Sequence, residues 1–209
     1  MSEIADRLKK VYAVKGADDC VDAYRDWADD YDSDLMSDEY GYVAPRETVN
    51  IFMRFFDKDA GAVLDAGCGT GLAGQELQRH GVAPVDGLDI SPEMLAKAEA
   101  KGCYRQVVAA DLTKPLALPE AGYGGIVSVG TFTHGHVGPE GLDHLLAVLR
   151  PGGVVTFSIN EGVYKEYDFE AKFAAVENDG VAEQVDLRQA DYLVNQGIGS
   201  WVCTFRKFA

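Results

Sequence analysis

A glycine-rich segment holds the residues whose types and spacing could support chemistry. Residues 63–71 read VLDAGCGTG, in which Asp65 ends an apolar run and Gly67, Gly69 and Gly71 follow at alternate positions. The apolar run predicts a buried parallel strand, because such strands are covered on both faces. The glycines permit backbone angles and a close ligand approach that a Cβ would prevent. We therefore predict that this segment, followed by a helix over residues 72–80, forms the floor of a nucleoside-cofactor site.

Two kinds of nucleoside-binding enzyme fit these glycines. Gly69, Gly71 and Gly74 also match the G-x-G-x-x-G pattern of dinucleotide-binding proteins, with Asp89 about 20 residues further on. Asp65 argues against that interpretation, because we expect its carboxylate at the mouth of the loop, where a dinucleotide would place its pyrophosphate. Like charges at one site are unfavourable. A cationic cofactor without phosphate would tolerate an acidic rim, whereas a glycine turn that binds nothing would leave the aspartate unexplained.

Hydrophobic patterning predicts a single α/β domain in this chain of 209 residues, of which 47% are hydrophobic. We expect two N-terminal helices with apolar faces, the second over Val21 to Tyr31, and a third that begins near Pro45. The expected strands are 62–66, 84–89, 105–109, 125–129 and 154–159, and the expected helices between them are 72–80, one that begins at Ser91, and 142–150. Such alternation brings the carboxyl ends of parallel strands to one edge of a sheet, where ligands bind.

The C-terminal part of the chain follows a different pattern. A helix near 169–177 is followed by two strand-like runs, 181–193 and 200–208. Their short connection indicates an antiparallel pair. A parallel sheet closed by an antiparallel hairpin differs from the all-parallel sheet of dehydrogenases, and this second discriminator is independent of the glycine loop.

These motifs resemble those of the class I S-adenosylmethionine (SAM) dependent methyltransferases, whose first motif is an acidic residue followed by Gly-x-Gly-x-Gly. Over nearly the whole chain, including YRDWADDYD at 24–32, GHV at 135–137 and EQVDLRQADYLV at 183–194, the sequence is similar to the Williams–Beuren-region methyltransferase-like proteins. Ubiquinone-biosynthesis-type small-molecule methyltransferases share the pattern. The resemblance implies an α/β fold with a Rossmann-like, doubly wound, seven-stranded sheet, mostly parallel with a C-terminal antiparallel hairpin. The expected organisation is one domain over 1–209, with N-terminal lid helices in 1–58, a cofactor-binding core in 59–160, and a helix and hairpin in 161–209.

The resemblance also implies which residues bind SAM. Asp89 is expected to accept hydrogen bonds from the ribose hydroxyls, with a helix-start acid as the alternative. Asp111 is expected to take the adenine amino group, with a turn-forming acid as the alternative. Tyr24 and Tyr31 are expected on a lid over the sulfonium, or else in the buried stripe of an ordinary helix. The complete expected set is Tyr24, Tyr31, Asp65, Ala66, Gly67, Cys68, Gly69, Gly71, Leu72, Asp89, Ile90, Met94, Asp111, Leu112, Val129, Gly130 and Thr131.

Methyl transfer from a sulfonium is an in-line displacement, so the protein mainly orients the acceptor and can remove its proton. His134 and His136 follow the fourth expected strand, beside the expected methyl position, and imidazole titrates near neutral pH. We predict that at least one of them is a catalytic base or orients the acceptor. The alternative is a helix cap or a bond to a backbone carbonyl. A non-catalytic SAM-binding sensor and, less favoured, an NAD-dependent dehydrogenase are the competing hypotheses.

Charge restricts the partners of this chain. The formal net charge is −15 at pH 7, from 34 acidic and 19 basic residues. Phosphate backbones and anionic membranes would be repelled, so we expect no nucleic acid and no stable membrane association. The expected acceptor is a small, uncharged or cationic molecule, with no obligate protein partner and with S-adenosylhomocysteine (SAH) as the cofactor product. The four cysteines lack metal-binding spacing, so we expect no metal, and the charged N-terminal segment predicts a cytoplasmic location.

Overall fold

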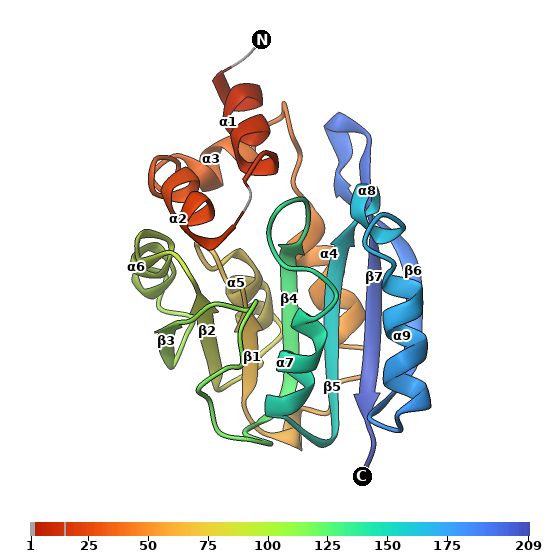
Figure 1. Ribbon diagram of the computed structural model, residues 1–209. Helices are drawn as coiled ribbons and strands as arrows, with labels where there is room; N and C mark the ends of the chain where they lie inside the picture. Colours follow the sequence, from red (N-terminus) through yellow and green to blue (C-terminus); the bar gives the residue numbers. More distant parts are fainter. Residues whose placement is uncertain (1–2, 15) are drawn as a thin grey trace.

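A seven-stranded sheet forms the centre of the computed structural model, which describes residues 3–14 and 16–209. The strand order is β3-β2-β1-β4-β5-β7-β6 (Figure 1). The strands are β1 (Val63–Ala66), β2 (Val85–Asp89), β3 (Gln106–Ala109), β4 (Tyr123–Phe132), β5 (Leu149–Asn160), β6 (Ala182–Leu193) and β7 (Ile198–Lys207). The first five are parallel, whereas β7 runs antiparallel to both β5 and β6. The expected doubly wound sheet with an antiparallel C-terminal hairpin is confirmed.

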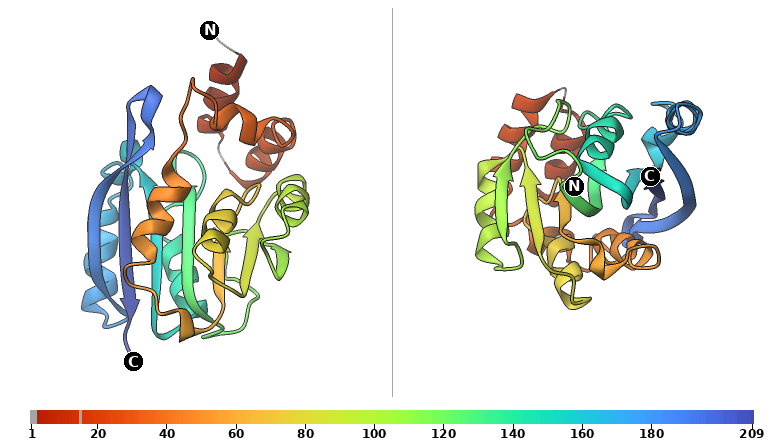
Figure 2. Two further views of the ribbon diagram at one scale, coloured as in Figure 1. Left: turned by 180° about the vertical axis from the view of Figure 1, so that it is seen from behind. Right: turned by 90° about the horizontal axis from the view of Figure 1, so that it is seen from below.

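Helices cover both faces of the sheet, with α7 and α9 on one face and α4 and α5 on the other (Figures 1 and 2). The helices that follow strands are α5 (Leu72–Arg79), α6 (Pro92–Ala100), α7 (Gly141–Val148), α8 (Glu161–Tyr164) and α9 (Phe169–Asn178). One hydrophobic cluster around Phe157 packs under α7 and α9, and another around Phe52 and Leu77 packs under α4 and α5. Burial on both faces accounts for the continuous apolar character of the parallel strands.

The N-terminal region differs from the sequence-based expectation. It forms α1 (Glu3–Tyr12), α2 (Ala17–Arg25), α3 (Tyr31–Leu35) and α4 (Ala44–Phe52), so the single helix expected over Val21 to Tyr31 is wrong. Residues 26–30 form turns instead. Aspartates fill this segment, and their side chains compete for backbone groups and disfavour helix interiors. Trp27 then anchors the turn, because its indole N–H donates to Asp34 at 2.7 Å and its ring packs 4.9 Å from that of Tyr31.

The N-terminal helices α1 to α3 lie over the carboxyl ends of the parallel strands (Figure 1). A connecting segment descends from α3 to α4 and forms a β-bridge between Tyr42 and Leu193, at the tip of the β6–β7 hairpin. Residues 130 and 131, expected to follow the fourth strand, belong to β4, which continues through a register irregularity between Ser128 and Phe132. Within the described part of the chain, no helix is both long and apolar enough to cross a membrane.

Candidate active site

A cavity of about 190 Å³, which we call the strand-end cavity, opens between the strand carboxyl ends and the N-terminal helices. Twelve residues of the expected cofactor set line it: Tyr24, Tyr31, Gly67, Gly69, Asp89, Ile90, Met94, Asp111, Leu112, Val129, Gly130 and Thr131. Gly16, Cys20, Ala110, Thr113, Gly135, His136 and Val137 complete the lining. Of these residues, His136 was predicted as a catalytic residue. Gly16, Cys20, Ala110 and Thr113 were not predicted.

The glycine loop leaves open space where a ligand could lie. Gly67, Gly69 and Gly71 all have positive φ values, 76°, 52° and 96°, that favour glycine. A Cβ at Gly67 would collide with the side chain of Thr131. An ideal Cβ at Gly69, by contrast, meets no heavy atom within 4 Å, and this residue lines the strand-end cavity. The loop therefore forms an open cradle that fits a closely approaching nucleoside.

Asp89 connects the glycine loop to the start of α6. Its Oδ2 accepts a hydrogen bond from the Gly69 amide at 2.8 Å, and its Oδ1 accepts one from the Ser91 amide at 2.9 Å. Burial raises the pKa of Asp89, and these amide hydrogen bonds oppose that shift. Asp89 therefore does act as an acid at the start of α6, as the alternative interpretation expected, through its contact with the Ser91 amide. Each carboxylate oxygen keeps a second lone pair, so the side chain retains capacity for a ribose hydroxyl.

Asp111 is also a turn-forming residue that lines the cavity. Its Oδ1 accepts hydrogen bonds from the Thr113 amide at 2.9 Å and the Thr113 hydroxyl at 2.6 Å, and Lys114 pairs with its Oδ2 at 2.9 Å. Burial alone would raise the pKa of Asp111, but the contacts with Thr113 and Lys114 outweigh it and the pKa is lowered. An ionised carboxylate therefore stands at the β3 end of the cavity.

Asp65 does not lie at the rim of the cavity, which corrects the sequence-based charge argument. Its side chain is 0% exposed and borders a smaller adjoining recess under the glycine loop. Burial raises the pKa of Asp65 to about 7, opposed by a hydrogen bond that the Tyr104 hydroxyl donates at 2.6 Å. A buried carboxyl that is partly protonated near neutral pH repels a pyrophosphate less than an exposed carboxylate would.

Other expected cofactor residues also shape the loop without lining the strand-end cavity. Cys68 and Leu72 border the same recess as Asp65. The carbonyl of Ala66 accepts a hydrogen bond from the Ser128 hydroxyl at 2.7 Å, and Gly71 is the N-terminal cap of α5.

The lining of the strand-end cavity distinguishes a SAM site from a dinucleotide site better than Asp65 does. No described residue that lines this cavity is lysine or arginine. Such a lining suits a cationic sulfonium better than a pyrophosphate, which attracts basic side chains.

His136 and Tyr24 form a hydrogen-bonded pair in the wall of the cavity. The His136 Nδ1 lies 2.7 Å from the carbonyl oxygen of His134, and its Nε2 lies 3.1 Å from the Tyr24 hydroxyl. A carbonyl only accepts, so Nδ1 carries the proton, and in the neutral ring Nε2 then accepts from Tyr24. Burial lowers the pKa of His136 and raises that of Tyr24 well above its usual value. Both groups are therefore neutral at pH 7.

His134 occupies a different environment from His136. Its ring packs against that of Tyr12, with centroids 5.6 Å apart, and it is not among the residues that line the strand-end cavity. Its backbone carbonyl instead fixes the tautomer of His136. Of the two histidines singled out in the sequence, the geometry thus brings His136 to the site and leaves the His134 side chain outside it.

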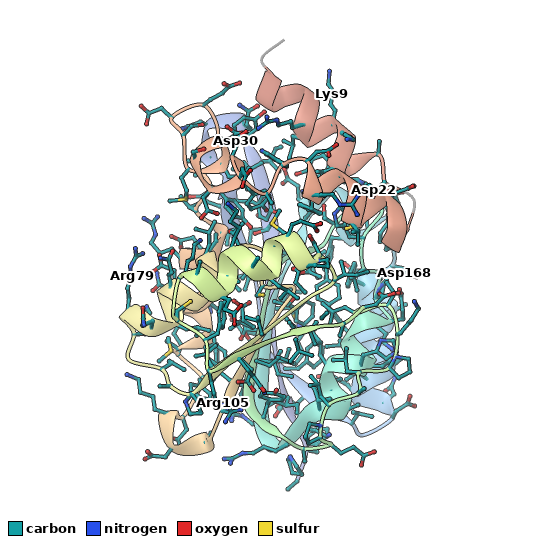
Figure 3. The ribbon with its side chains drawn as sticks, turned by 90° about the vertical axis from the view of Figure 1, so that its left-hand side faces the viewer. Lys9, Asp22, Asp30, Arg79, Arg105 and Asp168 are labelled. Carbon is teal, nitrogen blue, oxygen red and sulfur yellow. The ribbon has the colours of Figure 1, made fainter. Side chains whose placement is uncertain are left out.

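Ion pairs join the N-terminal helices to the core. Arg25 pairs with Glu93 at 3.1 Å, Asp29 with Lys97 at 2.5 Å, and Asp32 with Lys101 at 2.6 Å. Asp32 also accepts a hydrogen bond from Thr70 in the glycine loop. Figure 3 shows the N-terminal helices, with Asp22 and Asp30 labelled, above α6. Partners so far apart in the chain carry no local sequence signal, and the sequence analysis missed them.

Comparisons with known proteins identify the class. Residues 63–153 match the family model described as "Methyltransferase domain". Together with the 30% identical relative described next, this match shows that the chain belongs to the class I SAM-dependent methyltransferases. Within that class it is similar to the human (Homo sapiens) methyltransferase-like protein 27, with 30% identity over an alignment that covers 97% of this chain and 83% of the relative.

Solved structures share the fold at low sequence identity. The 4+2 cyclase SpnF superposes with a TM-score of 0.72 at 15% identity, covering 94% of this chain and 98% of SpnF. A TehB-like SAM-dependent methyltransferase from Corynebacterium glutamicum has a TM-score of 0.64 at 20% identity, covering 88% of this chain and 97% of that one. A cyclase among these structures illustrates that one fold hosts different reactions, so the acceptor must be argued from the site.

Proposed function

We propose that this protein transfers a methyl group from SAM to a small-molecule acceptor, by in-line displacement in the strand-end cavity. The observation that carries the proposal is the pair of His136 and Tyr24, both of which line that cavity. When bound, SAM supplies an electrophilic methyl group whose leaving group needs no proton. The protein then has to hold the two reactants in line and to receive the proton of the acceptor.

Residues at three successive strand ends would hold the cofactor. Gly67 and Gly69 would lie under the nucleoside, because the space above Gly69 is open. Asp89 would accept the ribose hydroxyls with its remaining lone pairs, and Asp111 would accept the adenine amino group beside Leu112. The backbone of residues 129–131 would face the methionine end. Tyr24 and Tyr31 would cover the sulfonium from the N-terminal helices, where aromatic rings stabilise a cation.

His136 would act as the base in this proposal. Its Nε2 is unprotonated and accepts from Tyr24, and burial keeps the ring neutral at pH 7. The His134 carbonyl holds Nδ1–H, so Nε2 stays directed at the Tyr24 hydroxyl. The His134 side chain would contribute to packing against Tyr12 rather than to proton transfer.

The remaining expectations about partners complete the proposal. A net charge of −15 favours a small acceptor over a nucleic acid, whose phosphates would be repelled. We place the activity in the cytoplasm, because the four cysteines are free in the structure and free thiols are typical of reducing compartments. The proposed reaction involves no obligate protein partner.

Transfer of an isotopically labelled methyl group tests this proposal. The protein is incubated with trideuteromethyl-SAM and a panel of uncharged, cationic and anionic small acceptors, and products are measured by mass spectrometry. We expect a labelled acceptor and an equal amount of SAH. Binding of SAH without transfer to any member of the panel would instead support the non-catalytic SAM-binding hypothesis.

A further inference from the structure

A second recess, with many aromatic side chains in its lining, adjoins the strand-end cavity. We call it the tyrosine chamber. It shares Tyr24, Tyr31 and Gly130 with the strand-end cavity. The rest of its lining consists of Leu8, Val11, Tyr12, Trp27, Leu35, Tyr42, Thr133, Tyr192 and Leu193. The chamber therefore begins at the His136–Tyr24 pair and extends under the N-terminal helices.

Hydroxyl groups converge inside this chamber. Thr133 is 2% exposed, and its Oγ1 is buried without a hydrogen-bond partner. Tyr42 and Tyr192 pack edge to face with ring centroids 5.2 Å apart. An ideal Cβ at Gly130 would lie 2.9 Å from the Tyr42 hydroxyl and 3.1 Å from the Tyr192 hydroxyl, so both hydroxyls meet beside this glycine. A buried polar group without a partner is costly, and a bound polar ligand would satisfy the Thr133 hydroxyl.

None of the described side chains that line the chamber is charged. A charge buried there without a counter-ion loses its hydration, and for a cation this cost exceeds the attraction of the aromatic rings, so the chamber favours an uncharged ligand. Aliphatic amines carry a positive charge near neutral pH. A hydroxyl group, by contrast, is an uncharged nucleophile at that pH, and it must lose a proton when it is methylated. The neutral His136 Nε2, reached through Tyr24, matches that requirement.

We propose that the tyrosine chamber receives the methyl acceptor and that the acceptor is an uncharged hydroxyl compound of the phenol type; this rests on the proposed function. In the step, a bond forms between the acceptor oxygen and the methyl carbon while the carbon–sulfur bond breaks and leaves its electron pair on sulfur. The acceptor proton passes to the Tyr24 oxygen, and the Tyr24 proton passes to the His136 Nε2. The products are the methyl ether, SAH and a protonated His136.

The size of the chamber adds a condition. Its volume of about 20 Å³ has room for little more than a water molecule. The roof comes from α1, α2 and α3, whereas Gly130 and Thr133 belong to or follow β4 and Tyr192 belongs to β6. Roof and floor are thus separate elements, and entry of a phenol ring requires the N-terminal helices to move away from β4.

Calorimetry with ligands that differ in charge tests the proposal. SAH-saturated protein is titrated with 4-ethylphenol, with the cation tyramine and with the anion 4-hydroxyphenylacetate, and each titration is repeated without SAH. We expect 4-ethylphenol to bind at least about tenfold more tightly than either charged analogue, as desolvation of an unpaired charge requires. Thr133→Val should lower the affinity for 4-ethylphenol about two- to tenfold, the effect of losing one hydrogen bond, and leave the affinity for SAH unchanged.

Thr48→Val is the matched control, because Thr48 is equally buried with an unpartnered hydroxyl but lies on α4 and lines neither cavity. It should change neither affinity. Three results overturn the inference: equal or tighter binding of tyramine or 4-hydroxyphenylacetate, no binding of 4-ethylphenol with or without SAH, or an unchanged affinity in Thr133→Val. If SAH itself does not bind, the proposed function fails, whereas SAH binding without phenol binding overturns the chamber proposal alone.

Discussion

The two halves of the candidate active site are built in different ways. The cofactor half consists of short loops directly after β1, β2 and β3, and each loop is fixed by contacts within a few residues or to the next strand, such as Asp89 with Gly69 and Ser91. The proposed acceptor half is the tyrosine chamber, whose walls come from α1 to α3, β4 and the β6–β7 hairpin. It exists only after distant segments have packed together.

Because the two halves are built differently, we expect each half to determine a different property of the enzyme. The cofactor half is set in the sheet edge, so its geometry follows from the fold of the class. The acceptor half is held by side-chain contacts such as Tyr42 with Tyr192, and by ion pairs such as Asp32 with Lys101. Changes in the acceptor half should therefore alter acceptor choice and rate, whereas changes in the cofactor half should alter SAM affinity.

The largest expected effect is on the rate. His136→Gln should lower kcat by roughly 10²–10⁴, the usual contribution of a general base, and leave SAH affinity nearly unchanged. Mass spectrometry of samples quenched at successive times measures the rate, and calorimetry measures the affinity for SAH. His80→Gln is the control, because His80 is on the surface beside Asn50. A near-parental rate in His136→Gln would show that catalysis proceeds by orientation alone.

The parent rate should also depend on pH. Burial lowers the pKa of His136, so protonation, which removes the base, occurs at a lower pH than for an ordinary imidazole. The rate should rise with pH in that acidic region and then reach a plateau. In His136→Gln this rise should disappear.

Cofactor affinity should respond to the other half of the site. Asp89→Ala should weaken SAH binding by about 1.5–3 kcal/mol, the range for lost hydrogen bonds to a charged group. Calorimetry measures the affinity and thermal unfolding checks that the loop contact to Gly69 is not needed for folding. SAH binding equal to that of the parent would leave Asp89 as a helix-start acid without a ligand role.

The sequence predicted the two halves unequally. Asp89, Asp111 and the glycines were predictable because a strand end, a loop and a helix start follow one another in the chain. The buried position of Asp65 was not, because it depends on Tyr104, which closes over it from another strand connection. The helical period from Val21 to Tyr31 was misleading, since contacts of Trp27 outweigh it.

The acceptor half could not be predicted from the sequence, because it depends on contacts between segments that are far apart in the chain. No pattern in the sequence places Tyr42 beside Tyr192 or leaves the hydroxyl of Thr133 without a partner in the same chamber. Of the two histidines in the loop after β4, which one faces the cavity depends on the His134 carbonyl and on Tyr24. Such information lies in tertiary packing rather than in spacing.

The smallest expected effect concerns the attachment of the N-terminal helices. Lys101→Met removes the ion pair with Asp32 and should raise deuterium exchange in residues 17–35 by up to about fivefold, consistent with about 1 kcal/mol for a pair whose side chains are 16% and 38% exposed. SAH should slow exchange there in the parent. Lys172→Met is the control, because its pair with Asp143 lies away from these helices. Equal exchange in parent and Lys101→Met would show that the pair does not hold the lid.

Calorimetric titration of the parent protein with SAH and with NADH tests most directly whether the strand-end cavity is a SAM site. The cradle at Gly69 and a described lining without lysine or arginine predict micromolar binding of SAH and no binding of NADH. SAH should also raise the melting temperature, because a ligand that binds the native state alone stabilises it. Tight binding of NADH together with no response to SAH would contradict the account.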